Sequence, residues 1–307
     1  MAEGNDFSIF LALTLSLMNP LTDFYLPEEF LAWQDWLFFG VALLVLLLGA
    51  SAYARFRKIR LTHELSEQDN PALAISFTGF LVALVLILTA VLQSSDPDDF
   101  SLKQSLLSSF LWTLGGLALL LTSLVVNDRI LFPRFDNRKE IITDRNPGLA
   151  VVEAATFIGT ALIIRGSLST QLGPSPIPEP WLTLLYFVLG QSLFLLFCRL
   201  YPKTSRIEIH RELEEDNPAV GLAFAGALLA FAWLLAEAKM NHDSFPVILA
   251  LGLFYLAVLS LARAALHYLL AHRFSLKDEL VRDRNWGLGL TEAALTLALA
   301  AVLTVAL

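Results

Sequence analysis

Long apolar runs alternate with short charged loops along most of the chain. A helix that rises 1.5 Å per residue needs about 20 apolar residues to cross roughly 30 Å of hydrocarbon. Ten-residue segments of alternating polarity, which transmembrane β-barrels use, are absent from the sequence. The pattern therefore predicts an all-α, polytopic membrane protein with eight transmembrane helices. The predicted spans are residues 36–54, 71–92, 105–126, 147–164, 181–198, 218–238, 245–270 and 286–307.

The start of the chain follows a different pattern. Its apolar stretch is only about a dozen residues long and follows an acidic beginning, whereas a secretory signal peptide begins with basic residues. The stretch is also too short for a further crossing of the membrane. We therefore predict an interfacial or re-entrant segment over residues 1–32.

Composition supports a membrane environment and narrows the chemistry. The 307 residues are 56% hydrophobic and 16% charged, whereas a soluble domain has roughly 45–50% apolar residues. The net charge of −8 gives no support to nucleic-acid binding. The single cysteine, Cys198, and the scattered histidines form no cluster with zinc spacing, and no set of nucleophiles falls among the spans. We therefore expect no metal, no cofactor and no enzymatic activity.

Lysine and arginine are concentrated in the loops after the first, third, fifth and seventh predicted spans. The opposite loops hold only Lys103, Arg165 and Lys239, while Arg263 lies inside the seventh span. The positive-inside rule then places the four basic loops in the cytoplasm. Because the number of spans is even, both termini are expected on the other side, which is the periplasm for a bacterial inner membrane.

Each basic loop ends in a similar helix-start motif. The motifs read EQDNPALAISF, TDRNPGLAVVEAA, EEDNPAVGLAF and RDRNWGLGLTEAA, and their asparagines are Asn70, Asn146, Asn217 and Asn285. Asparagine is a preferred N-cap residue, and three motifs place proline at the first helical position, where its missing N–H costs nothing. Helix starts also bind anions, so an anion site is the functional alternative to plain capping.

The four motifs alternate in type, which indicates a tandem duplication. The first and third share a histidine and a phenylalanine, and the second and fourth share a phenylalanine and a glutamate. The shared residues are His63 with His210, Phe77 with Phe224, Phe135 with Phe274, and Glu153 with Glu292. We therefore predict four hairpins in ABAB order, as parallel repeats about an axis along the membrane normal. The predicted units are residues 33–165 and 181–307, joined by a linker at 166–180 that is rich in Ser, Pro and Gly.

Before each motif asparagine, apolar residues stand at helical spacing among charges, as at Leu61 and Leu65 or Leu276 and Leu280. This spacing predicts short amphipathic helices on the cytoplasmic interface. Their polar side chains are candidates for binding a cytoplasmic protein partner or anionic lipid, and simple solvation is the alternative. The candidates are His63, His210, Arg138, Lys139 and Lys277.

The motif and the topology together resemble a known family. A basic amphipathic loop, then asparagine, then small and apolar residues as in NPALAISFTG and NPAVGLAFAG resembles the bacterial inner-membrane domain-of-unknown-function family three-fifty. Short members have four helices in two hairpins, so two family units in tandem cover residues 36–307. Members usually have glycine before the motif asparagine, whereas this chain has Asp69, Arg145, Asp216 and Arg284. The resemblance implies an inner-membrane location and company with envelope-stress proteins, and it implies no established activity.

Two matched carboxylates fall at lipid depth. Glu153 and Glu292 each stand seven residues after a motif asparagine, about 10 Å into the membrane. A carboxylate there costs about 2.5–3.5 kcal/mol, so both are functional candidates. Arg263 lies at nearly the same depth as Glu292, and we predict an ion pair between them, which is either functional or purely structural. The position matching Arg263 in the first unit is Leu124, so Glu153 is expected to lack a basic partner and to be protonated, or to face water or a bound cation.

Two functions are left open by these observations. The first is transport of a proton or small cation between two pseudo-symmetric halves, with Glu153, Glu292 and Arg263 forming the intramembrane site. The second is a non-conducting scaffold of an envelope-stress system that recruits cytoplasmic partners or anionic lipid. Both functions are compatible with a homo-oligomer in the lipid bilayer.

Overall fold

The computed structural model describes residues 33–94, 101–131, 136–169, 177–205, 207–270 and 275–306. By packing, the chain divides into two compact parts, Met1–Val41 and Ala42–Leu307, and this division differs from the two repeat units. The name unit is kept below for the repeat units. Residues 1–32, for which an interfacial or re-entrant segment is predicted, lie outside the described residues, as do Phe135 and Phe274.

Among the described residues, eight helices are long and apolar enough to cross a membrane. The fold is therefore all-α and polytopic, as predicted, and a lipid bilayer is its environment. The eight helices are α2 (Trp33–Arg57), α3 (Pro71–Ser94), α4 (Leu102–Leu131), α6 (Pro147–Leu168), α7 (Glu179–Ser205), α9 (Pro218–Asn241), α10 (Phe245–Leu270) and α12 (Trp286–Ala306).

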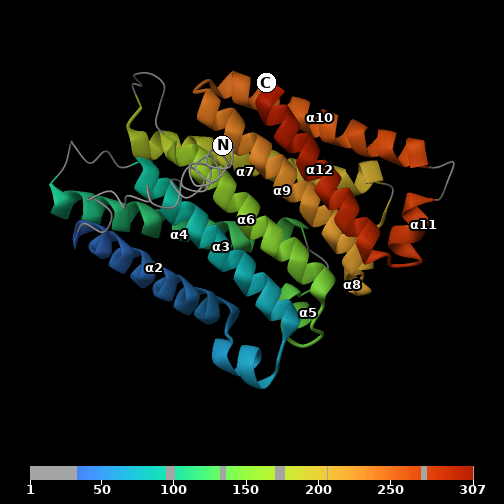
Figure 1. Cartoon of the computed structure of the whole chain (residues 1–307), viewed down its shortest axis with the longest axis horizontal. Coiled ribbons are helices and arrows are strands. Elements are labelled where there is room, and N and C mark those ends of the chain that lie inside the picture. The colour runs from blue at the N-terminus through green and yellow to red at the C-terminus, as the bar shows by residue number, and fades with distance from the viewer. Residues whose placement is uncertain are drawn as a thin grey trace, which may run out of the picture. The chain divides into compact units, whose positions relative to one another are not determined.

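The four helices that begin at a motif asparagine pack side by side in chain order. Figure 1 shows α3, α6, α9 and α12 as this series, here called the motif row, and its neighbouring pairs make the most extensive contacts in the fold. Helices α4, α7 and α10 pack against the row. The end of the row that carries the four asparagines is called the motif end.

Small residues let neighbouring helices of the motif row approach closely. A Cβ atom on Gly79 of α3 would collide with Ala154 of α6, and one on Gly226 of α9 would collide with Ala293 of α12. These two contacts occupy matching places in the two units. Without a hydrophobic force between helices in lipid, such close packing is a main source of helix association.

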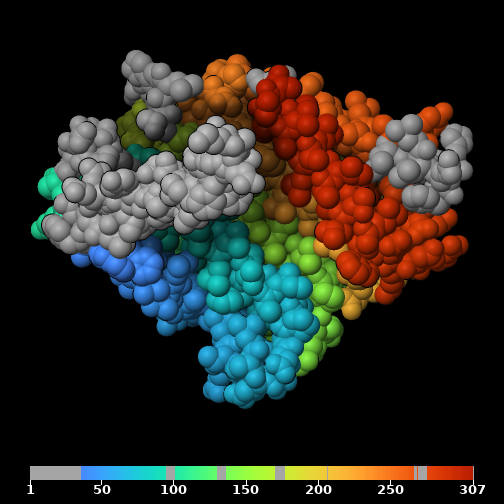
Figure 2. All heavy atoms as spheres, viewed as in Figure 1, coloured from blue at the N-terminus to red at the C-terminus, as the bar shows by residue number. Residues whose placement is uncertain are grey.

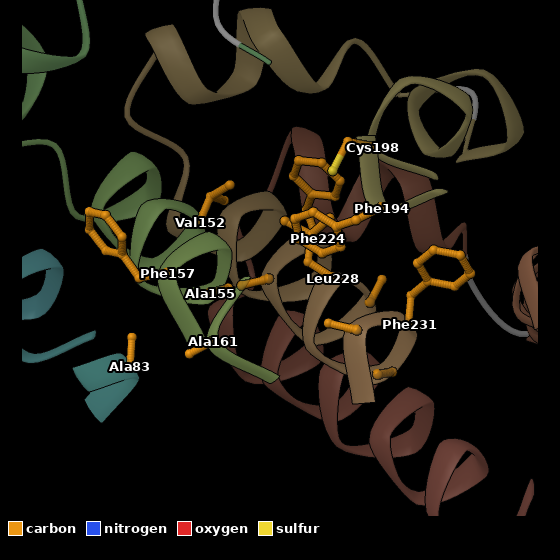
Figure 3. Close-up of a cluster of buried hydrophobic side chains, with 14 of the residues drawn as sticks. Ala83, Val152, Ala155, Phe157, Ala161, Phe194, Cys198, Phe224, Leu228 and Phe231 are labelled. Carbon is orange, nitrogen blue, oxygen red and sulfur yellow. The ribbon is translucent and has the colours of Figure 1, made fainter. Parts of the chain in front are cut away.

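Aromatic side chains fill the space between α6, α7 and α9. Phe194 and Phe231 are fully buried, and the ring of Phe231 stacks on that of Phe197 with centroids 4.4 Å apart. Figure 3 shows Phe194, Phe224 and Phe231 together with Cys198 in this region. The single cysteine is therefore a buried packing residue.

A short helix precedes each helix of the motif row. These are η1, a π-helical turn (His63–Glu67), and α5 (Asn137–Ile142), α8 (Ile209–Glu214) and α11 (Leu276–Val281). Ile141, Leu213 and Leu280 are buried on the inner face of the last three. The short helices are amphipathic, as the sequence predicts, with apolar residues toward the bundle and most charged residues exposed, although Glu212 of α8 is buried.

Candidate functional site

Each motif asparagine caps the helix that follows it. The side-chain oxygen accepts a backbone N–H from Leu73 at 3.0 Å, Leu149 at 2.8 Å, Ala219 at 3.1 Å and Leu288 at 3.1 Å for the four copies in order. These bonds satisfy donors that a helix start otherwise leaves unpaired. Capping therefore accounts for the motif asparagines without a bound anion.

A glutamate of the preceding short helix completes each helix start. The asparagine backbone N–H donates to the carbonyl oxygen of this glutamate at 2.9–3.1 Å in all four copies, and three of the asparagine amides also reach its carboxylate. The glutamates are Glu64, Glu140, Glu212 and Glu279. This turn forces the residue before each asparagine into left-handed backbone, with φ of 48° at Asp69, 56° at Arg145, 59° at Asp216 and 48° at Arg284. Glycine suits that conformation best, which explains the family pattern from which this chain departs.

The asparagine amides also join successive repeats. Asn70 donates to the carbonyl oxygen of Ile141 at 3.0 Å, and Asn217 donates to that of Leu280 at 2.8 Å. Asn146 donates in the same way to the carbonyl oxygen of Leu213. Each of the first three motif helices therefore holds the short helix that leads into the next one.

The predicted ion pair between Arg263 and Glu292 is present in the second unit. The Arg263 guanidinium lies 4.5 Å from the centroid of the Tyr201 ring, and the Tyr201 hydroxyl donates to a Glu292 carboxylate oxygen at 3.5 Å. The Glu292 side chain is 2% exposed and that of Arg263 is 11% exposed. One buried cation thus balances one buried anion where α7, α10 and α12 meet.

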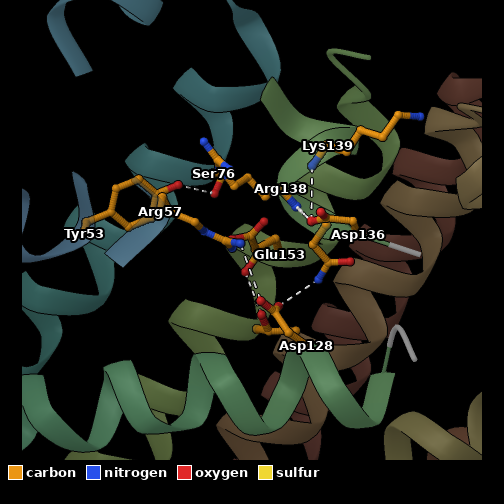
Figure 4. A network of polar contacts seen from close by, with 10 residues as sticks. Tyr53, Arg57, Ser76, Asp128, Asp136, Arg138, Lys139 and Glu153 are labelled. Atoms are coloured by element: carbon orange, nitrogen blue, oxygen red, sulfur yellow. Dashed lines mark hydrogen bonds and ion pairs between the residues drawn. The ribbon is translucent and has the colours of Figure 1, made fainter. Parts of the chain in front are cut away.

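The expectation that Glu153 has no basic partner is wrong, because Arg57 forms an ion pair with it. The predicted first span ends at residue 54, whereas α2 continues to Arg57, whose side chain is buried. A second carboxylate, Asp128 of α4, lies 3.5 Å from the same guanidinium and accepts a hydrogen bond from Asn137 at 2.7 Å. Figure 4 shows this cluster, in which one arginine faces two acids.

The two pairs are equivalent in their glutamates and different in their arginines. The first arginine comes from α2, whereas the second comes from α10, the counterpart of α4. Tyr53 of α2 matches Tyr201 of α7, yet it bonds Ser76 at 2.9 Å. Apart from the atoms of the ion pairs, both pairs contain buried atoms without a hydrogen bond among the described residues, namely Glu153 Oε2, Arg263 Nη1 and Glu292 Oε2.

A series of buried polar side chains extends from Glu153 along α6, with further members on α4 and on α7 of the second unit. Thr160 donates to the side-chain oxygen of Gln191 at 3.5 Å, and Gln191 donates to that of Asn127 at 3.0 Å. The series, here called the polar column, consists of Glu153, Thr156, Thr160 and Ser167 of α6, Gln191 of α7 and Asn127 of α4, all of them buried. Positions matching the α6 members in α12 hold Glu292, Leu295, Leu299 and Ala306, so the second unit has the acid without the column.

A cavity of about 320 Å³ lies at the other end of the polar column. Ser167 of the column lines it together with Gly116, Ile164 and Thr183, and Trp112 and Trp181 stand at its wall. Ser167 is 14 residues beyond Glu153 on α6, a rise of about 21 Å. The column therefore lies along α6 between the Arg57 cluster near the motif end and a cavity near the opposite end.

The residues proposed to bind a partner or lipid lie on separate short helices. His63 pairs with Glu67 at 2.9 Å, and Arg138 donates to the carbonyl oxygen of Lys58 at 3.1 Å. Lys139 pairs with Asp144 at 3.1 Å, which raises the pKa of its ammonium group. Lys277 is exposed on α11, and His210 is half-buried on α8. The structure does not gather these five into one site.

Comparison with known proteins agrees with the duplicated architecture. A family model described as Domain of Unknown Function (DUF350) matches the chain twice, over residues 25–168 and 174–307. No curated protein and no solved structure matches the chain.

Proposed function

The chain belongs to the DUF350 family as two units in tandem, and we propose that it moves protons or a small cation across the membrane along helix α6. The observation that carries the proposal is the polar column, which lies between Glu153 and a cavity near the opposite end. Ionisable residues buried in transmembrane helices typically mark such pathways.

The Arg57 cluster supplies an entrance and a switch. Asp128 has a side chain that is 29% exposed, whereas Glu153 is 2% exposed, so an incoming cation meets Asp128 first. Arg57 stays charged and can pair with either carboxylate. When Glu153 takes up a proton it releases Arg57 to Asp128, and when it gives up the proton along the column it regains Arg57. A small metal cation would act in the same way by occupying the carboxylate in place of the guanidinium.

The surroundings of Glu292 in the second unit favour a structural role for this residue. Glu292 faces one arginine and a tyrosine hydroxyl, and the α12 positions that would continue a column are apolar. No second carboxylate among the described residues shares Arg263. We therefore assign the pathway to the polar column along α6 and a helix-fastening role to Glu292, in place of two equivalent carriers.

Flux into liposomes tests the proposal, and the duplication provides a matched control. The purified protein is reconstituted, and entry of protons, K⁺ and Na⁺ is followed separately under an imposed gradient. We expect flux above that of protein-free liposomes, its loss in Glu153→Gln, and its retention in Glu292→Gln. Wild-type flux at the protein-free level, or equal flux in Glu153→Gln, would rule the pathway out.

A non-conducting scaffold of an envelope-stress system is the second candidate. It is favoured by the pairing of both buried acids with arginine and by the charged outer faces of α5, α8 and α11. This reading expects no flux, and it expects less co-purified anionic phospholipid or partner after substitution of Arg138, Lys139 and Lys277 by glutamine. Lys103→Gln, on an exposed residue at the opposite end, is the matched control.

A further inference from the structure

The motif row is open at the α12 end. The face of α6 that packs against α9 contains Gly148, Val152, Ala155, Gly159 and Gly166, and all five are buried. The matching positions of α12 are Gly287, Thr291, Ala294, Ala298 and Val305, and all five are exposed, Val305 by 89%. Figure 2 shows α12 in dark red at the surface. The last motif helix therefore presents, uncovered, the face that α6 uses to bind its successor.

The α3 end of the motif row is open in the complementary way. Helix α9 meets α6 through Ala232 and Ala236, which face Gly159 and Gly166. The matching α3 residues are Val85 and Thr89, and both are exposed, Val85 by 45%. Thr78 and Val82 extend the same exposed face, whereas their counterparts Ala225 and Leu229 of α9 are buried or half-buried. The two ends thus carry the two halves of the α6–α9 interface.

In the part of the chain that the structure describes, the hydrogen bond that joins one repeat to the next is also unused at both ends of the motif row. Each of the first three motif asparagines donates to a backbone carbonyl oxygen in the short helix of the next repeat. The accepting residue directly follows the glutamate of that short helix, and the three are Ile141, Leu213 and Leu280. Among the described residues, Asn285 donates to no carbonyl oxygen of another repeat, and it is exposed. At the other end, Leu65 follows Glu64 as Leu213 follows Glu212, so its carbonyl oxygen occupies the matching acceptor position, to which no motif asparagine of the described residues donates.

We propose that a second copy of this chain docks head to tail, with α12 of one copy against α3 of the next. The contact repeats the α6–α9 interface, and Asn285 of one copy donates to the Leu65 carbonyl oxygen of its neighbour. Small residues on facing helices favour such close approach in lipid. The interface is heterologous, so further copies can join in the same sense. The proposal stands independently of conduction.

Paired single-cysteine variants test the docking directly. An ideal Cβ on Gly159 would lie 3.1 Å from the Cβ of Ala232, so the matching residues Ala298 and Val85 of two copies should be within disulfide reach. Ala298→Cys and Val85→Cys are made separately in a Cys198→Ala background and co-expressed, then oxidised in native membranes. We expect covalent dimers from the mixture and background levels from either variant alone. Leu253→Cys, exposed on α10, paired with Val85→Cys is the control and should stay at background.

Each other outcome overturns the proposal. Dimers from either variant alone would indicate a symmetric contact or random collision. Absence of a mixed dimer, while a maleimide reagent labels both thiols, would show that the faces are covered otherwise, by lipid or by residues 1–32. A chain that carries both cysteines should form a ladder of species larger than a dimer or closed rings, and dimers alone would contradict head-to-tail growth.

Discussion

At the scale of single residues, the motif asparagine combines two functions in one side chain. Its oxygen caps the helix that it begins, and its amide holds the short helix of the next repeat. The sequence predicted the cap because asparagine, proline and an apolar run stand in the right order. The second contact was not predictable, because its partner is a backbone carbonyl far along the chain. The glutamate of each short helix could have been predicted from the sequence, because it precedes each motif asparagine at nearly constant spacing.

The two roles separate in a comparison of Asn146→Ala with Asn285→Ala. Both variants lose a cap, which costs about 1 kcal/mol. Asn146→Ala also removes the hydrogen bond to the Leu213 carbonyl oxygen, which keeps the Asp216 backbone N–H as a donor, and this loss costs about a further 0.5–1.5 kcal/mol. We expect thermal unfolding of the monomer in detergent to show the larger loss for Asn146→Ala. Equal losses would show that the contact between repeats contributes nothing.

The carboxyl of Glu140 gives stability a pH dependence. Burial at the motif end raises its pKa, although the hydrogen bond from Asn146 acts in the opposite direction. A raised pKa in the folded state means that folding favours the protonated form, so this carboxyl destabilises the fold as pH rises through that pKa. Glu140→Gln should therefore unfold at a higher temperature than wild type at neutral pH. The difference should shrink as the pH is lowered, and a constant difference would contradict the assignment.

At the scale of elements, burial of charge explains both the successful and the failed predictions. The Arg263–Glu292 pair was predictable because both residues fall at one depth on consecutive helices. The Arg57–Glu153 pair was missed because an arginine at the edge of a span reads as a loop residue, and only the course of α2 shows that it turns inward. The polar column was missed as well, since hydroxyl and amide residues on three helices carry no signal until those helices are placed together.

Breaking the Arg263–Glu292 pair should cost more than removing it whole. Arg263→Met leaves a buried carboxylate without its cation, a loss of about 3–5 kcal/mol. The double variant Arg263→Met, Glu292→Met replaces both charges by apolar groups and should recover most of that loss. Tyr201→Phe, which removes the long hydroxyl contacts with Glu292 and the Ala223 carbonyl oxygen, is the mild control. Unfolding in detergent provides the measurement, and a double variant no better than Arg263→Met would argue against a structural pair.

At the scale of the whole molecule, the sequence predicts the number of helices and their duplication. It does not predict which helices pack against each other. Eight apolar runs and four related motifs predict the hairpins and the two units, because length and periodicity are local properties. The motif row is a choice of neighbours, and apolar faces in lipid do not reveal that choice. Its small contacts, such as Gly226 against Ala293, become meaningful only with the helices in place.

Because the motif row is open at both ends, the size of an assembly depends on how much of this chain the membrane holds. If the edge of one copy fits the opposite edge of the next, nothing in a single chain limits the count, and the bilayer confines growth to a plane. The size of each assembly then follows the local abundance of the chain, as in a polymerisation equilibrium. A modest rise in synthesis would lengthen existing arrays, so function could respond to dosage without any ligand.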